Sequence, residues 1–254
     1  MFQKDYIMRM IEQLATAIAA LLGSKSKTRI EECHQMLDGS LYDLTGMREE
    51  TLLKLAHKDL ISIISGSKQI NTKKCFALAE MLKLKADVSK DNPARSLHLY
   101  LKSFNIFVEV TLERSKVENN SEQTINEIID VIKLYEIPKE SKQLLFRYYE
   151  LTGHYDKAED VLFKMLNTNN MDDMVDEGFS FYERLKGKTR KELEDGNLPL
   201  GEVIEGLEVY QNLVAVADNN SVKKPLHRNI EEEKAFSEVK DNSNDHIGDV
   251  FSLG

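Results

Sequence analysis

The chain has 254 residues, of which 41% are hydrophobic, and a formal net charge of −9 at pH 7. An acidic chain is a poor ligand for nucleic acid, because neutralising phosphates requires clustered Lys and Arg. The 4 Pro and 12 Gly residues are few for this length, which favours long helices over a fold with many turns. The composition therefore predicts an all-α protein with no nucleic-acid partner.

Cysteine usage and hydropathy indicate the cellular compartment. Cys33 and Cys75 are the only cysteines, and no CxxC is present, which is typical of a reducing cytoplasm. No stretch approaches the roughly 18–20 uncharged apolar residues of a transmembrane helix. The apolar run Leu14–Leu22 resembles a signal peptide weakly, but Asp5 and Glu12 precede it and no cleavage site follows. We therefore expect a cytoplasmic protein without stable membrane insertion.

The first predicted helix covers residues 4–22. Its apolar residues recur at spacings of four and three, which places them on one face: Ile7, Ile11, Leu14, Ile18 and Leu21. Such a face packs either on the rest of the chain or on a second copy. A membrane-surface helix usually carries a polar face rich in Lys and Arg, which this helix lacks.

Apolar periodicity predicts further helices along the rest of the chain up to about Ala217. Local residues indicate where several of them begin or end. Asp38-Gly39 ends one helix, Gly66 the next, and Asn92-Pro93 begins another. The predicted ranges are 28–37, 48–65, 72–88, 93–114, 121–135, 139–152, 155–166, 172–186, 189–196 and 199–217.

From residue 218 onward the composition becomes polar and the periodicity fades, so residues 218–254 are predicted to be a mostly disordered tail. A small apolar cluster lies near its end: Ile247, Val250, Phe251 and Leu253. Two interpretations stay open. The cluster has no packing role, or it is a short motif that docks on a partner or folds back into a groove of the same chain.

Residues 138–167 predict a helical hairpin that resembles a tetratricopeptide repeat. The resemblance rests on Leu145, Tyr149, Gly153, Tyr155, Ala158, Leu162 and Met165. In that family a small Ala lets two helix backbones approach, a Tyr fills the adjacent space, and a Gly lies near the turn. Residues 72–114 are similar to a second repeat only loosely, since Lys85 stands in place of the Tyr. Residues 1–217 are therefore predicted to form one irregular, superhelical array of antiparallel hairpins.

The whole chain also resembles a family of uncharacterised bacterial proteins. The resemblance rests on its opening, FQKDYIMRMIEQL (Phe2–Leu14), and on ELEDGNLPLGEVIEGL (Glu192–Leu207). It implies a bacterial cytoplasmic helical protein and supplies no activity.

The repeat resemblance implies a concave groove lined by the first helix of each pair. On this basis Gln143, Arg147 and Glu150 are candidate partner-binding residues, and Phe76, Lys83 and Asp87 are their looser equivalents. An Arg in a groove can bind a carboxylate through two hydrogen bonds, so Arg147 is the first candidate for capture of an acidic peptide or C-terminus. The alternative is that Arg147 is an ordinary exposed helix residue.

The search for an enzyme motif finds no GxGxxG, Walker loop, HExxH or GxSxG. The acidic run Met171–Glu177 lacks the alternating ligands and Gly of a calcium loop. We therefore predict no catalytic residue, cofactor or metal. The expected function is a protein- or peptide-binding scaffold or adaptor. The alternatives are a structural protein that self-assembles through its first helix, and an enzyme of unfamiliar type.

Overall fold

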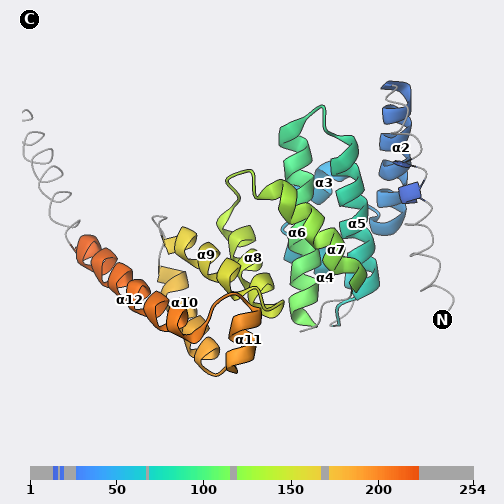
Figure 1. The fold of residues 1–254 in the computed structure, drawn as a ribbon. Helices are drawn as coiled ribbons and strands as arrows, with labels where there is room; N and C mark the ends of the chain where they lie inside the picture. Colours follow the sequence, from blue (N-terminus) through green and yellow to red (C-terminus); the bar gives the residue numbers. More distant parts are fainter. Residues whose placement is uncertain are drawn as a thin grey trace, which may run out of the picture. The chain divides into compact units, whose positions relative to one another are not determined.

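The computed structural model describes residues 14–16, 18–19, 27–66, 69–114, 119–166 and 172–222. Within these ranges every regular element is an α-helix, so the predicted all-α class is confirmed (Figure 1). The helices are α2 (Lys27–Thr45), α3 (Glu49–Lys54), α4 (His57–Ser65), α5 (Thr72–Val88), α6 (Pro93–Glu113), α7 (Asn119–Ile132), α8 (Lys139–Leu151), α9 (Tyr155–Leu166), α10 (Asp172–Lys186), α11 (Arg190–Asp195) and α12 (Leu200–Val222).

The chain divides into two compact units. Unit 1 comprises Met1–Met165 and Thr189–Pro199, and unit 2 comprises Leu166–Lys188 and Leu200–Gly254. Of the predicted first helix, residues 14–16 and 18–19 are described; they are helical, and Leu14 and Ile18 are buried. The rest of that helix lies outside the described residues, as does the part of the predicted tail beyond Val222.

Unit 1 is built around the α5–α6 hairpin. The helix α6 contacts α3, α4, α5, α7 and α8, and α5 also contacts α2. The facing sides of α5 and α6 are apolar and fully buried, as Leu78, Leu82 and Phe104 illustrate. Two serines of α6 donate hydrogen bonds to carbonyls of α5: Ser103 to Ala79 at 2.6 Å and Ser96 to Ala86 at 2.9 Å. These bonds satisfy buried hydroxyls and allow the two backbones to lie close together.

Short-range signals place several helix ends correctly. Asn92 Oδ1 accepts from the Arg95 N–H at 3.1 Å, with Pro93 in the first turn. Thr189 and Glu192 form the expected capping box at the start of α11. Gly66 and Gly153 adopt positive φ angles of 62° and 75°, the left-handed conformation that glycine tolerates best.

Two predicted boundaries are wrong because tertiary contacts override the local signal. The helix α2 continues through Asp38 and Gly39 to Thr45, which buries Leu41 one turn after Leu37. The single helix predicted over 48–65 is two helices, because Leu55 and Ala56 are extended. At this break the Leu55 carbonyl accepts a hydrogen bond from Lys102 Nζ at 2.5 Å.

In unit 2 the helices α10 and α12 pack on each other through aromatic rings. Tyr210 of α12 lies between Phe179 and Tyr182 of α10, with ring centroids 5.3 and 5.7 Å apart. The ring fits because residue 178 is Gly, where an added Cβ would overlap the Tyr210 ring. The Tyr210 hydroxyl donates to the Val175 carbonyl at 3.2 Å. The helix α12 runs to Val222, five residues beyond its predicted end.

Candidate functional site

The upstream candidates Phe76, Lys83 and Asp87 all lie on α5 and all contact neighbouring helices. The Phe76 ring packs against Phe107 of α6 with centroids 5.5 Å apart. Lys83 forms ion pairs with Asp87 at 3.2 Å and with Glu127 of α7 at 2.9 Å. Asp87 also accepts a hydrogen bond from the Tyr100 hydroxyl at 2.5 Å. These three side chains therefore stabilise unit 1, whatever else they bind.

The downstream candidates lie on α8. Gln143 and Glu150 are half-buried, whereas Arg147 is exposed. The guanidinium of Arg147 lies close enough to the Glu109 carboxylate of α6 to help lower the pKa of that group, after the larger effect of a hydrogen bond to His57. Arg147 is thus accessible to a ligand, and its surroundings include carboxylates.

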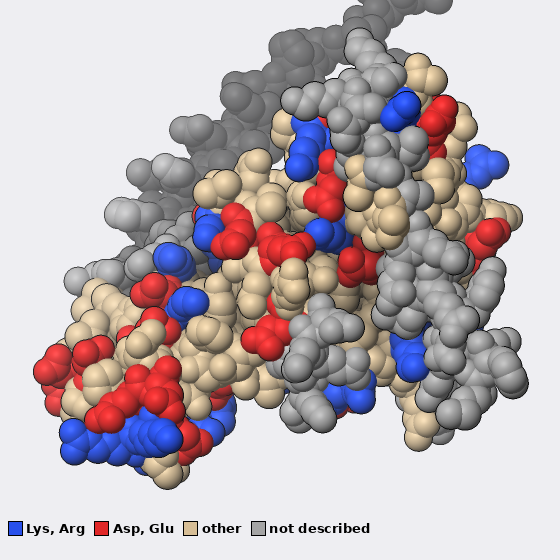
Figure 2. All heavy atoms as spheres, turned by 45° about the vertical axis from the view of Figure 1, so that its right-hand side comes forward, with Lys and Arg blue, Asp and Glu red and all other residues tan. Residues whose placement is uncertain are grey.

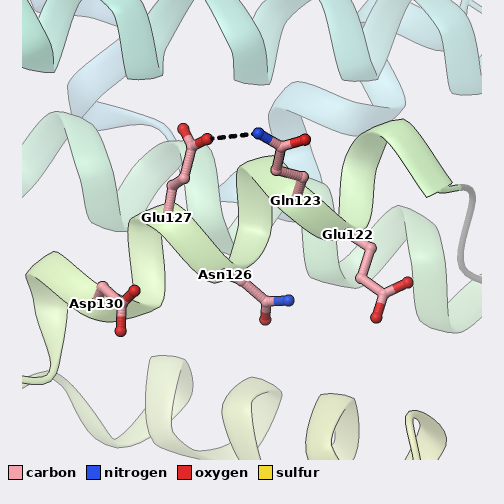
Figure 3. Close-up of a pocket in the computed structure, with 5 residues that line it drawn as sticks. All are labelled: Glu122, Gln123, Asn126, Glu127 and Asp130. Atoms are coloured by element: carbon pink, nitrogen blue, oxygen red, sulfur yellow. Dashed lines mark hydrogen bonds between the residues drawn. The ribbon is translucent and has the colours of Figure 1, made fainter.

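A hollow of about 490 Å³ lies along α7 and is lined by Glu122, Gln123, Asn126, Glu127 and Asp130. Figure 3 shows Gln123 and Glu127 on one side of α7 and Glu122, Asn126 and Asp130 on the opposite side of the same helix. The Gln123 amide donates to Glu127 at 3.1 Å, and Asp130 pairs with the exposed Lys133 at 2.6 Å. The side chains of Glu122 and Asn126 form no ion pair or hydrogen bond within the described ranges.

Tyrosines of α8 lie near the same carboxylates. Burial raises the pKa of Tyr148 most strongly and the Glu122 carboxylate raises it further. Burial, and after it the Asp130 carboxylate, likewise raises the pKa of Tyr149. The Tyr148 side chain is 1% exposed, and its hydroxyl has no hydrogen-bond partner in the described structure. The Tyr149 ring has Lys157 Nζ 5.7 Å from its centroid, so it already accepts a cation.

A second polar cluster surrounds His57, the first residue of α4. Its Nε2 lies 3.3 Å from Glu109 of α6, and its Nδ1 lies 3.6 Å from Glu140 of α8. The histidine side chain is almost fully buried. A substrate could therefore not reach the ring without a rearrangement, and the cluster joins three helices of unit 1.

A third cluster is centred on Lys85, which is fully buried on α5. Its ammonium contacts Asp38 of α2 and lies 2.5 Å from Glu49 of α3. Glu49 also accepts two hydrogen bonds from Arg95 of α6, each 2.8 Å long. Burial raises the pKa of Glu49, but the hydrogen bonds from Arg95 and Lys85 outweigh it and leave that pKa below its ordinary value. This network connects α2, α3, α5 and α6.

Sequence reasoning missed the α7 hollow, although a signal was present. Glu122, Asn126 and Asp130 recur at intervals of four, which places them on one face of the predicted helix. On the face seen in Figure 2, basic and acidic side chains are interspersed. Among the described residues no group of three or more His, Cys, Asp or Glu side chains could hold a metal ion. No helix in the described ranges is long and apolar enough to cross a membrane.

The fold and these clusters define an all-α protein with open polar surfaces. The sequence profile of a family of unknown function (DUF6483) matches residues 1–215, and the chain belongs to this family. No curated protein and no solved structure matches the chain.

Proposed function

We propose that the protein is a binding scaffold that holds a Lys- or Arg-bearing segment of a partner protein in the α7 hollow. The observation that carries this proposal is the lining of the hollow, which consists only of carboxylate and amide side chains. Carboxylates and amide oxygens accept hydrogen bonds from ammonium and guanidinium groups. The net charge of −9 favours encounter with a basic partner.

The neighbouring aromatic side chains support a cationic ligand. A Tyr ring beside carboxylates attracts an ammonium or guanidinium group through its negative face, and Tyr149 already has Lys157 in this position. Tyr148 is 1% exposed and gives a bound peptide no contact, so the carboxylates and amides of α7 carry the recognition.

Charge-matched peptides test the proposal. A fluorescein-labelled peptide with four Lys or Arg residues spaced by Gly and Ser is titrated with the full chain at low and at moderate salt. The double variant Glu122→Gln/Asp130→Asn should weaken binding about tenfold, because each lost charge pair is worth roughly 1 kcal/mol or less at an exposed site. The control Glu202→Gln/Glu208→Gln removes two exposed charges from α12 and should leave affinity unchanged. Equal losses in both variants, or no binding of the basic peptide, would refute the proposal.

A second candidate rests on the exposure of Arg147, which remains available to an acidic peptide or a C-terminal carboxylate. The same titration with a labelled Asp- and Glu-containing peptide distinguishes it. Binding of that peptide, lost in Arg147→Ala and retained in the α7 double variant, would favour this candidate over the basic ligand. Self-assembly through the first helix is less supported, since Leu14 and Ile18 are already buried in the single chain.

A further inference from the structure

The helix α12 carries one packed apolar stripe and one exposed apolar stripe, and Leu200 and Ile204 near its N-terminus are exposed on a different side. Val203, Tyr210 and Val214 are buried. Val209, Leu213 and Val216 follow one another at spacings of four and three, and they are 50%, 39% and 59% exposed. At about 100° per residue, this exposed stripe is turned by about 110° around the helix axis from the buried one.

The exposed stripe is short. It covers the eight residues 209–216, or about 10 Å along the axis. Glu202 and Glu205 continue the same side of the helix toward its N-terminus and bound the apolar surface with carboxylates. A stable interface between two proteins usually buries about 800 Å² on each partner, from roughly 20–30 residues. Three side chains on two turns are therefore too few to hold a second copy of a chain with a net charge of −9.

A tethered segment needs much less contact area. A covalent connection raises the effective concentration of a segment, up to the millimolar range, so weak docking suffices. The chain itself supplies such a segment. Residues 247–253 contain four apolar side chains within seven positions: Ile247, Val250, Phe251 and Leu253. The 24 residues 223–246 connect this segment to the end of α12.

The length of this connection fits the distance to be covered. A chain of 24 residues can span at most about 80 Å when fully extended. Leu213 lies nine residues before Val222, or about 14 Å back along the helix axis. We infer that residues 247–253 of this chain dock on the Val209–Leu213–Val216 stripe of α12 and cover it. This inference is independent of the α7 hollow.

Hydrogen exchange of the full chain tests the docking. Amides of residues 207–216 should exchange about tenfold faster in Val250→Asp/Phe251→Asp, because a segment at ~1 mM effective concentration with a Kd near 0.1 mM protects its site by that factor. The control Val239→Asp alters an apolar residue of the same region outside the cluster and should leave exchange unchanged. Protection in the wild-type chain should not depend on protein concentration.

A complementary measurement separates docking from a folding defect. The synthetic peptide IGDVFSLG, added at ~1 mM to a chain shortened to residue 246, should restore most of the lost protection. Equal exchange in the full and shortened chains would overturn the inference. Protection that rises with protein concentration and survives the tail variant would also overturn it, and would assign the stripe to a second copy.

Discussion

Replacing Glu49 with Gln should destabilise unit 1 by about 3 kcal/mol, because breaking a buried ion pair from one side typically costs about 3–5 kcal/mol. The lower end applies because Lys85 keeps its contact with Asp38, a carboxylate that is 52% exposed. For a chain of this size, such a loss corresponds to a decrease in melting temperature of roughly 6–12 °C. Arg95 is partly exposed and can return to water, so it adds little.

The variant Lys85→Met provides the decisive comparison. It removes the buried charge and leaves Glu49 paired with Arg95 and Asp38 in contact with water, so it should cost clearly less than Glu49→Gln. Adding Glu49→Gln to Lys85→Met should then cost much less than Glu49→Gln alone, because the two side chains are coupled. The matched control Glu183→Gln breaks an exposed pair with Lys186 and should change stability by less than about 0.5 kcal/mol.

Urea unfolding followed by far-ultraviolet circular dichroism measures these differences, since the chain has no Trp. The pH dependence provides a further check. The pKa of Glu49 is lower in the folded chain than in the unfolded chain. The Glu49 carboxylate therefore stabilises the fold fully above the unfolded pKa of about 4.3, and this stabilisation is lost as pH falls through the folded pKa. The wild-type advantage over Glu49→Gln should therefore shrink below about pH 4. A cost under 1 kcal/mol at pH 7, or additive double-mutant effects, would refute the reasoning.

Three further predictions follow from the packing. Gly178→Ala should destabilise unit 2 by about 1–3 kcal/mol in thermal unfolding, because the new Cβ overlaps the Tyr210 ring, whereas Gly201→Ala, in open space, should be neutral or stabilising. The pKa of Glu109 is lowered mainly by its hydrogen bond to His57, so Glu109→Gln should cost about 1.5 kcal/mol at pH 7 and progressively less as pH falls below about 4; a constant difference across pH would contradict this. Tyr148→Phe removes a hydroxyl without a partner and should change unfolding free energy by less than about 1 kcal/mol, so a larger loss would show that the hydroxyl has a partner.

The parts of the fold that sequence predicted correctly depend on neighbouring residues. The Asn92 cap, the Thr189–Glu192 capping box and the Gly153 turn act within four residues, so their signals are complete in the local sequence. The wrong boundaries depend on distant residues. The helix α2 continues past Gly39, and this continuation buries Leu41. The break at Leu55 involves a hydrogen bond from Lys102, 47 positions away.

The candidate sites likewise depend on residues that are distant in the sequence. Glu122 and Asp130 could have been assigned to one helix face from their spacing, but the exposure of that face depends on which side of α7 is covered by α6. Lys85 could not be recognised as buried, because its partners Asp38 and Glu49 lie far away in the sequence. The sequence placed Phe76 and Lys83 on a helix, but it could not show that they contact α6 and α7.

The contact between Gly178 and Tyr210 has a consequence for how α10 and α12 can move. The ring occupies the space above the glycine, and its hydroxyl reaches the Val175 carbonyl three residues earlier. Sliding α12 by one turn would bring Gly206 or Val214 opposite Gly178, and neither can fill that space and reach the carbonyl. The contact therefore fixes the axial register of α10 and α12, and a shift by one turn would lose both the ring packing and the hydrogen bond.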